Sequence, residues 1–391
     1  MKILVLTTAH QPDDDRIYYK QVISLLTKYA EVHIVAPVRA GETFALDPRV
    51  VLHAIPRRPG LLGRLLTTFR AAVQVMRLKP DVCHFHDLEF VAMVPLIRLL
   101  TRTRLIYDAH EVYPESMLIS PKIPGWLRPA AARIVDLIEK NCARLCARII
   151  TADEPNTASF AKCGVPVTTL FNFPRLSLFQ PDARRVAELR NSYPGRRILL
   201  YQGTMSRERG LFHMLAGMHL LQELVPEALL MLVGLNDADL RAEAEAQTRR
   251  DQTEHHVAIL PWVPHADIPA YIALAEIGLA SLQPNPKFNK NIPIKMFEYM
   301  ACGVPVLAAD LPAIANFLAG SGAGVLYDST DAQAFAREAQ RMLANRADRE
   351  AMARAGRDAV ARHWNWGEME KQLLQIYAEL EPAGAAARSA T

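Results

Sequence analysis

The sequence lacks several features that would assign it to common functional classes. Residues 7–16, TTAHQPDDDR, follow the first apolar run without a glycine, and the chain has no P-loop motif. Neither a nicotinamide-type dinucleotide site nor a P-loop nucleotide site is therefore expected. The run Ile3–Leu6 is too short for the core of a signal peptide, and Arg98 interrupts the apolar stretch 90–100, which is well short of a membrane span. We expect a cytoplasmic protein, either free or at the inner face of the cytoplasmic membrane.

Cysteine and excess charge are also scarce. The five cysteines are an odd number scattered through apolar segments, which indicates buried reduced thiols and not a disulfide framework. Cys142 and Cys146 have no neighbouring His or Cys in the sequence, so we expect no metal site and no metal cofactor. The 45 basic and 41 acidic residues leave a net charge of +4, too small to indicate nucleic acid as the main partner.

The length and the periodicity of apolar residues predict two α/β domains. A single core stops growing near 250–300 residues, and this chain has 391, half of them hydrophobic. Short β-branched runs alternate with segments of helical period, which is typical of parallel sheets with crossover helices. We expect strands at 2–7, 31–36, 50–55, 81–86, 104–108, 148–151 and 167–171, and then at 198–202, 228–233, 257–260, 277–280, 304–309 and 324–327.

Composition shifts along the chain set the predicted boundaries. The proline-containing segment 173–197 breaks both periods and is interpreted as an irregular hinge. We therefore expect an N-terminal domain over 1–172, a C-terminal domain over 198–364, a final amphipathic helix over 365–380 and a frayed tail over 381–391. Ligands are expected where loops leave the carboxyl ends of the strands, in a cleft between the domains.

A polar loop with a proline runs directly into a predicted helix within 289–310, NKNIPIKMFEYMACGVPVLAAD. A helix start offers backbone N–H groups and a partial positive charge to an anion such as a diphosphate. Lys295 adds a cation, and the Glu298 carboxylate is placed to accept hydrogen bonds from both hydroxyls of a ribose. The alternative is that Glu298 is an ordinary solvated helix residue.

A second candidate phosphate element lies at 201–215, YQGTMSRERGLFHML. Gly203 follows a predicted strand and permits close approach of a ligand to the backbone, and Arg207 and Arg209 precede a predicted helix. Guanidinium groups suit a diphosphate because they donate in a planar fork. Surface arginines are common at helix starts, so this element favours a phosphate site mainly in combination with 289–310.

Histidines and acidic residues follow two predicted strands of the first half, in 84–89 (HFHDLE) and 107–115 (YDAHEVYPE). A histidine beside carboxylates has a tunable pKa and can exchange hydrogen bonds with sugar hydroxyls or a departing phosphate. Structural histidines are the alternative for either cluster. Because the clusters recur on neighbouring strands, we favour a functional role for His110.

The segment Arg57–Lys79 contains six basic residues and no acidic one. On a helical wheel Arg70 and Arg77 flank one apolar face, formed by Leu61, Leu62, Leu65, Leu66, Phe69, Val73 and Met76. Two interpretations remain open. The helix either lies on an anionic membrane surface or packs its apolar face on the sheet.

Taken in order, several strings give the chain a family resemblance: KILVLTTAHQPDDDRIYYKQVISL, HDLE, YDAHEVYPE, YQGTMSRERGL, IPIKMFEYMACGVPVLAAD and HWNWGEMEKQLLQIY. Together they resemble the retaining glycosyltransferases of family 4. The resemblance implies the GT-B fold, in which two Rossmann-like domains face each other across a cleft. It also implies that the helix after Trp364 and Trp366 returns to the N-terminal domain.

The resemblance further implies an activity and its partners. A hexose-type sugar is expected to pass from a nucleotide diphosphate sugar to a hydroxyl of a glycan or lipid-linked acceptor, with retention of configuration and without an essential metal. The donor is expected on the C-terminal domain and the acceptor on the N-terminal one. Surface polysaccharide biosynthesis is the expected role, with peripheral contact to an anionic membrane as the further expectation from Arg57–Lys79.

Residue by residue, the resemblance implies that Glu298 holds the nucleotide ribose and that Arg209 contacts the donor diphosphate. It also implies that His110 lies near the transferred sugar. We expect His110, Arg209 and Lys295 to carry the catalysis. The expected donor site comprises Gly203, Thr204, Arg209, Asn291, Ile294, Lys295 and Glu298, and the expected acceptor side comprises His10, Arg16, His86, Asp87 and Glu111.

Two positions depart from the family pattern. Lys290 stands eight residues before Glu298, where the family motif has its first glutamate, and Thr204 stands where an arginine is usual. Two alternative functions therefore remain at this point. One is a nucleotide-sugar 2-epimerase of the same architecture, and the other is a non-catalytic nucleotide-sugar-binding protein.

Overall fold

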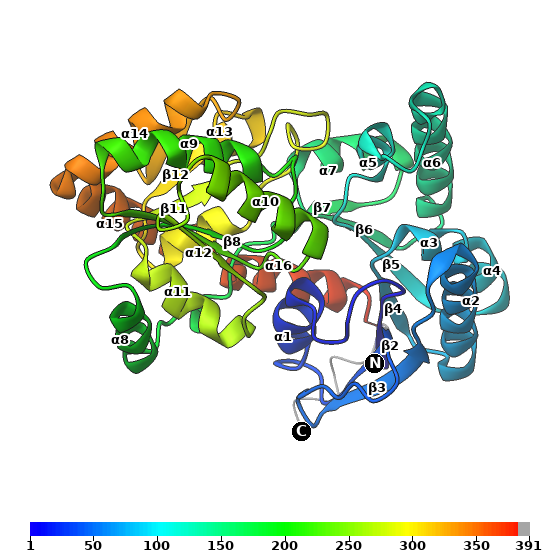
Figure 1. Ribbon diagram of the computed structural model, residues 1–391. Coiled ribbons are helices and arrows are strands. Elements are labelled where there is room, and N and C mark those ends of the chain that lie inside the picture. The colour runs from blue at the N-terminus through cyan, green and yellow to red at the C-terminus, as the bar shows by residue number, and fades with distance from the viewer. Residues whose placement is uncertain (382–391) are drawn as a thin grey trace. The chain divides into compact units, whose positions relative to one another are not determined.

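The computed structural model describes residues 1–381, and the chain divides into two compact units (Figure 1). Unit 1 comprises Met1–Asn172 and the segment from Trp366 onward, and unit 2 comprises Phe173–Asn365. Each unit is built on one sheet, and all strand pairs in both sheets are parallel. The predicted α/β class with two doubly wound sheets is confirmed. Most of the predicted tail, 382–391, lies outside the described residues.

The sheet of unit 1 has seven strands in the order β3-β2-β1-β4-β5-β6-β7. Their bounds are Ile3–Leu6 (β1), Val32–Val38 (β2), Val50–Pro56 (β3), Val82–Phe85 (β4), Arg104–Ala109 (β5), Arg148–Thr151 (β6) and Val167–Thr169 (β7). The crossover helices are η1 (Asp15–Val22), α1 (Ile23–Leu25), α2 (Gly60–Leu78), α3 (Leu88–Val91), α4 (Val94–Leu100), α5 (Tyr113–Ile119), η2 (Gly125–Leu127), α6 (Arg128–Ala143), α7 (Glu154–Phe160) and η3 (Ala161–Cys163).

The sheet of unit 2 has six strands in the order β10-β9-β8-β11-β12-β13. Their bounds are Arg197–Gln202 (β8), Ala228–Val233 (β9), Val257–Leu260 (β10), Ile277–Ala280 (β11), Val306–Ala309 (β12) and Gly324–Tyr327 (β13). The helices are η4 (Leu176–Leu178), α8 (Ala183–Ser192), α9 (Leu211–Leu224), α10 (Ala238–Arg250), η5 (His265–Asp267), α11 (Ile268–Leu274), α12 (Lys295–Ala301), α13 (Pro312–Leu318), α14 (Ala332–Ala344) and α15 (Arg346–Arg362).

One segment was predicted with the wrong local structure. The irregular stretch expected at 173–197 contains the ten-residue helix α8. The Asp182 side chain caps its first turn by accepting hydrogen bonds from the amides of Arg184 and Arg185. Of its side chains only Leu189 is buried, so the apolar periodicity that would have revealed the helix is weak.

The final helix, α16 (Trp366–Glu379), packs on unit 1 although it comes from the far end of the chain. Trp366 is fully buried, and its indole N–H donates to the Ser24 hydroxyl at 2.8 Å. Further along the helix, the Tyr377 hydroxyl lies 3.0 Å from Nδ1 of His84. The helix therefore completes the core of unit 1, next to a histidine of the sheet.

Helix α2 does not pack on the sheet through its leucines. Its buried positions are mostly small, with Gly63, Ala71 and Ala72 among them, whereas Leu61 and Leu62 are 77% and 72% exposed. The sheet-packing interpretation is therefore wrong for the N-terminal half of the predicted apolar face. Val73 and Met76, near the C-terminal end of α2, are half-buried.

The five cysteines are free thiols, as predicted. Cys83, Cys146 and Cys163 are buried, and Cys142 and Cys302 are half-buried. Within residues 1–381, no helix combines the length and the apolar character needed to cross a membrane.

Replacing Trp366 with alanine is expected to destabilise unit 1 by about 3–5 kcal/mol, because the change leaves a large cavity and removes the hydrogen bond to Ser24. Urea unfolding followed by circular dichroism measures the loss. Trp262→Ala is the matched control, since Trp262 is 54% exposed and its truncation leaves no cavity. Equal stability losses in the two variants would contradict the role assigned to α16.

Candidate functional site

Strand order reverses at one point in each sheet. In unit 1 the chain winds outward from β1 to β3 and then returns to continue from β4, so the reversal lies between β1 and β4. In unit 2 it lies between β8 and β11. Loops diverge at the carboxyl ends of such neighbouring strands and leave a crevice for ligands. Most of the predicted site residues lie at these two points.

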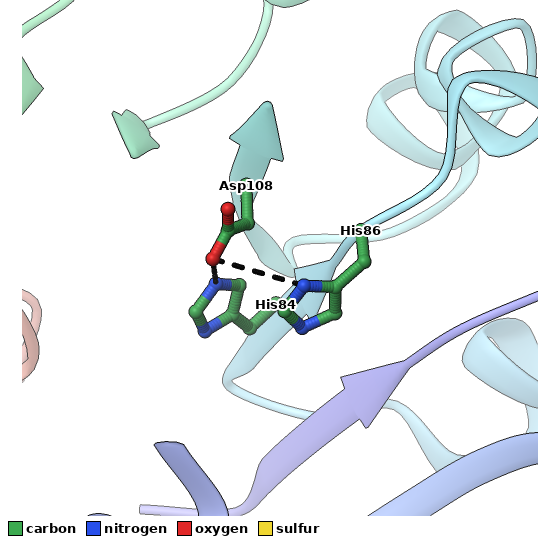
Figure 2. Close-up of side chains that lie close together, drawn as sticks. All are labelled: His84, His86 and Asp108. Atoms are coloured by element: carbon green, nitrogen blue, oxygen red, sulfur yellow. Dashed lines mark ion pairs between the residues drawn. The ribbon is translucent and has the colours of Figure 1, made fainter. Parts of the chain in front are cut away.

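A buried carboxylate organises the cluster of unit 1. Asp108 on β5 is fully buried, and the Arg16 guanidinium donates to both of its oxygens at 3.1 Å. Strand alternation turns His84 and His86, on and just after β4, toward the same carboxylate, as Figure 2 shows. Their ring nitrogens lie 3.6 and 3.7 Å from Oδ2 of Asp108. His110 Nδ1 lies 3.6 Å from Oδ1.

The local geometry of η1 explains how two of its side chains reach one carboxylate. The segment is a π-helix, in which residues five apart share a face. Arg16 and Gln21 have this spacing, and both donate to Asp108. The same spacing pairs Lys20 with Asp15 at 2.6 Å.

Protonation in this cluster follows from burial and from one strong ion pair. Burial lowers the pKa of His84 and, more strongly, that of His86, so both rings are neutral at neutral pH. Burial alone would raise the pKa of Asp108, but Arg16 and the neighbouring histidines hold it well below its usual range. The group therefore contains one buried negative charge matched by one buried positive charge.

His84, His86 and Asp108 also have the composition of a metal site. Each offers one ligand atom, and these atoms lie within 4.8 Å of one another. Both carboxylate oxygens already accept hydrogen bonds from Arg16, however. The positive charge of the guanidinium would repel a metal ion bound to the same carboxylate. The donor set therefore fits a network of protein charges better than a metal centre.

A second, more exposed ion pair lies beside this cluster. His10 Nδ1 is 3.2 Å from Asp14, and its Nε2 is 3.5 Å from Asp87. Burial alone would lower the pKa of His10, but Asp14, Asp87 and Glu111 together raise it to about 9. Asp87 is held in place by the Thr7 hydroxyl at 2.7 Å and the Thr8 amide at 2.6 Å. The structure thus brings the predicted acceptor-side residues together around His110, whose ring centroid lies 5.4 Å from that of His10.

In unit 2 the central feature is the buried ammonium group of Lys295. Lys295 is 7% exposed, and its Nζ has no hydrogen-bond partner among the described residues. The group lies 3.3 Å from the centroid of the Tyr201 ring, at the end of β8. Burial lowers the pKa of Lys295 well below its usual value, and Arg209 acts in the same direction while Glu298 opposes both. A buried cation beside a second cation is the arrangement expected of a site that binds an anion.

Close backbone approaches fix the loop that carries Arg209. Gly210 has a φ of +84°, and a Cβ there would lie 2.0 Å from the carbonyl oxygen of Ser281, just after β11. Only glycine permits this contact, which ties the start of α9 to the neighbouring strand. Gly203 has a φ of +101°, and a Cβ there would be in van der Waals contact with Nζ of Lys295, at 3.7 Å.

Glu298 lies one turn into α12, half-buried, and accepts a hydrogen bond from the Gln202 side chain. The backbone amides at the start of α12 are less available than predicted. Those of Phe297 and Glu298 donate to the carbonyl of Ile294, and that of Met296 donates to Pro293. The cationic side chain of Lys295 is therefore the stronger anion-binding group at this helix start.

The remaining predicted residues of unit 2 differ in their local contacts. Asn291 lies in a turn whose amides donate to the Lys287 carbonyl. Thr204 is exposed, and its carbonyl accepts a hydrogen bond from Tyr201. Arg207, unlike Arg209, points away from the Lys295 group, because it pairs with Glu243 and lies over the Phe212 ring. The structure therefore separates the two arginines of the predicted phosphate element.

Several residues of the two clusters were not named as site residues from the sequence: His84, Asp108, Tyr201 and Gln202, which lie within the candidate site segments singled out there, and Gln21, which does not. The period-two pattern of strands could have found His84 and Asp108, since they precede His86 and His110 by two residues and share their faces. Gln21 carried no such signal, because its alignment with Arg16 depends on the π-helical turn.

Replacing Asp108 with asparagine leaves the Arg16 guanidinium buried without a matching charge. We expect a loss of about 3–5 kcal/mol in the free energy of unfolding, measured by urea denaturation at pH 7. The double variant Arg16→Met/Asp108→Leu should lose less than the single variant, since it removes both buried charges. A single variant as stable as the wild type would contradict the proposed charge network.

The raised pKa of His10 predicts a pH-dependent stability. A histidine whose pKa rises on folding from 6.5 to about 9 stabilises the folded state fully below pH 6.5 and loses that contribution as pH rises through 9. The difference in melting temperature between wild type and His10→Asn should therefore be largest near pH 6 and shrink toward pH 10. His363→Asn, at an exposed position, is the matched control, and a pH-independent difference for His10→Asn would overturn the assignment.

Comparisons with known proteins agree with this arrangement. Residues 5–173 match the family model described as Glycosyltransferase Family 4, and residues 185–359 match the one described as Glycosyl transferases group 1. The chain is 26% identical over 400 residues to alpha-maltose-1-phosphate synthase from Mycolicibacterium smegmatis, with 96% of this chain and 99% of that protein covered. It is 32% identical over 123 residues to D-inositol 3-phosphate glycosyltransferase from Salinispora tropica, where the match spans 32% of this chain and 24% of that relative.

Solved structures support the same fold. The crystal structure of HepE from Anabaena in complex with UDP-glucose is similar with a TM-score of 0.74 at 16% identity, covering 97% of this chain and 100% of that one. The two family models between them match most of the chain. This protein belongs to the family 4, or group 1, glycosyltransferases, which are retaining enzymes of the GT-B fold.

Proposed function

We propose that this protein transfers a hexose-type sugar from a nucleoside diphosphate sugar to a hydroxyl of a glycan or lipid-linked acceptor, in the assembly of a surface polysaccharide. The observation that carries the proposal is the buried, unpartnered ammonium group of Lys295 beside Arg209 and Glu298. A diphosphate carries the negative charges that would pair with both Lys295 and Arg209. HepE, a structure of the same fold, was solved with UDP-glucose, which makes uridine nucleotides the first donors to test.

Each donor residue has a distinct part in the proposal. Lys295 and Arg209 hold the diphosphate, and they stabilise the charge that develops on it as the sugar leaves. The Glu298 carboxylate holds the ribose hydroxyls, and its hydrogen bond from Gln202 fixes its orientation. Gly203, which lies beside Nζ of Lys295, lets the donor approach the backbone at the strand end without meeting a side chain.

The proposed chemical step needs no protein nucleophile. The bond between the anomeric carbon and the β-phosphate oxygen breaks, and the acceptor oxygen forms its bond to that carbon on the same face. The acceptor proton passes to the departing phosphate oxygen. His110 orients the sugar or the acceptor, and its contact with Asp108 fixes the direction of its ring. His10 and Asp87 are proposed to bind acceptor hydroxyls.

Substitution of Lys295 with methionine provides the sharpest test. Loss of the Lys295 ammonium group is expected to raise the Kd for UDP or GDP about 10- to 100-fold, because a hydrogen bond to a charged group contributes about 1.5–3 kcal/mol. The same substitution should raise the melting temperature of the free protein, since it removes a buried charge without a partner. Isothermal titration calorimetry and thermal unfolding measure the two effects.

Matched variants make the test specific. Arg209→Ala and Glu298→Ala should weaken nucleotide binding to a similar extent, whereas Arg207→Ala should not, because Arg207 pairs with Glu243 outside the cluster. Free nucleoside diphosphate released with an elongated acceptor identifies transfer, and a rearranged donor sugar identifies epimerisation. Unchanged nucleotide affinity in Lys295→Met and Arg209→Ala would remove the proposed donor site.

A further inference from the structure

Large apolar side chains are exposed almost entirely on one part of unit 1. Among residues 1–381, all but two of the exposed large hydrophobic residues lie on α2, α4, η2 and α6 or directly after α6. The most exposed are Leu61 and Leu62 on α2, Leu99 on α4 and Trp126 in η2, at 77%, 72%, 81% and 80%. The two exceptions, Leu224 and Trp262, lie in unit 2.

These helices form one surface. Helix α4 packs against both α2 and α6, and the three helices lie together in Figure 1. Their inner sides belong to a single hydrophobic cluster on one face of the unit 1 sheet, which includes Ala71, Val94 and Ala143. Their opposite sides consequently face outward together. We call this outward side of α2, α4 and α6 the three-helix surface.

The distribution of residue sizes on α2 is the reverse of that in an ordinary surface helix. Small residues face the core, so α2 lies close to the sheet, and a Cβ on Gly63 would come within 2.7 Å of the Arg58 carbonyl oxygen. Leu61, Leu65 and Phe69 point outward instead. Contiguous apolar surface of this kind marks an interaction site and not a solvated face.

The charges around the three-helix surface are mostly positive. Its exposed basic residues, from the segment before α2 to the residue after α6, are Arg57, Arg58, Arg64, Arg77, Lys79, Arg98, Arg102, Lys122, Arg133 and Arg144; of these, Arg64 pairs with Glu89. Of the acidic residues within α2, α4 and α6, Asp136 pairs with Lys140 at 2.6 Å and Glu139 is buried against Tyr107. The surface therefore combines apolar side chains that insert with long cationic ones that reach outward.

We propose that the three-helix surface docks on the headgroup region of a bilayer that contains anionic lipids. Leucines on α2 and α4 and the exposed Trp126 enter the boundary between headgroups and acyl chains, and the flanking arginines contact lipid phosphates. The 19 residues of α2 form the long axis of this contact, lying in the plane of the membrane. The proposal does not depend on the donor site, which lies in unit 2.

Vesicle flotation with the full chain tests the proposal. Vesicles of phosphatidylcholine and phosphatidylglycerol should bind the protein at low salt, and binding should weaken as salt screens the charges. Pure phosphatidylcholine vesicles should bind it less. The variant Leu61→Ser/Leu65→Ser/Phe69→Ser should lower the partition coefficient about tenfold or more. Leu224→Ser/Trp262→Ser is the matched control, and it should bind like the wild type.

Two further measurements separate the outcomes. The circular dichroism spectrum of the triple variant, and the rise in its melting temperature on adding UDP, should match those of the wild type. A loss of vesicle binding then does not reflect misfolding or loss of the donor site. Size-exclusion chromatography with light scattering tests for a second copy as the occupant. Absence of vesicle binding at low salt, wild-type binding by the triple variant, or a dimer that the triple variant dissociates would each overturn the proposal.

Discussion

Parallel pairing of every strand is the constraint on which both clusters depend. Strands that run in the same direction bring all their carboxyl ends to one edge of the sheet, and the reversal of strand order lets two loops diverge there. His86 and Asp108 meet because they stand at the ends of adjacent strands. Lys295 and Tyr201 meet because α12 follows β11, whose neighbour in the sheet is β8. In both sheets, parallel strand order thus brings together residues that are far apart in the sequence.

The two clusters differ in their electrostatics. In unit 1 the Asp108 carboxylate is matched by Arg16, and the buried histidines add no charge. In unit 2 the cations Lys295 and Arg209 lie together, and Lys295 is buried without a hydrogen-bond partner among residues 1–381. The first arrangement is stable by itself and positions His110. The second places a buried cation beside another cation, which is costly, and the diphosphate of the proposed donor is the charge that would offset this cost. This difference agrees with an acceptor side in unit 1 and a donor side in unit 2.

Strands and site residues were predictable to different degrees. Strands such as β9, β10 and β13 have the predicted bounds, because each is a short apolar run that ends at a glycine, proline or charged residue. The contacts of Gln21 and the opposite directions of Arg207 and Arg209 were not predictable, because they depend on the turn geometry of η1 and on Glu243. The helical wheel could not decide whether the α2 leucines face the sheet or point outward. Packing on the sheet and contact with a membrane surface require the same apolar periodicity.

The position of α16 has a consequence for how the chain matures during synthesis. Ser24 and His84 leave the ribosome long before Trp366 and Tyr377, which complete their surroundings. Unit 2 is continuous in sequence from Phe173 to Asn365, so all of its strands are available before α16 emerges. Synthesis of unit 1 therefore starts before that of unit 2 and is completed after it, and a ribosome that stops before residue 366 leaves unit 1 without the helix that completes its core.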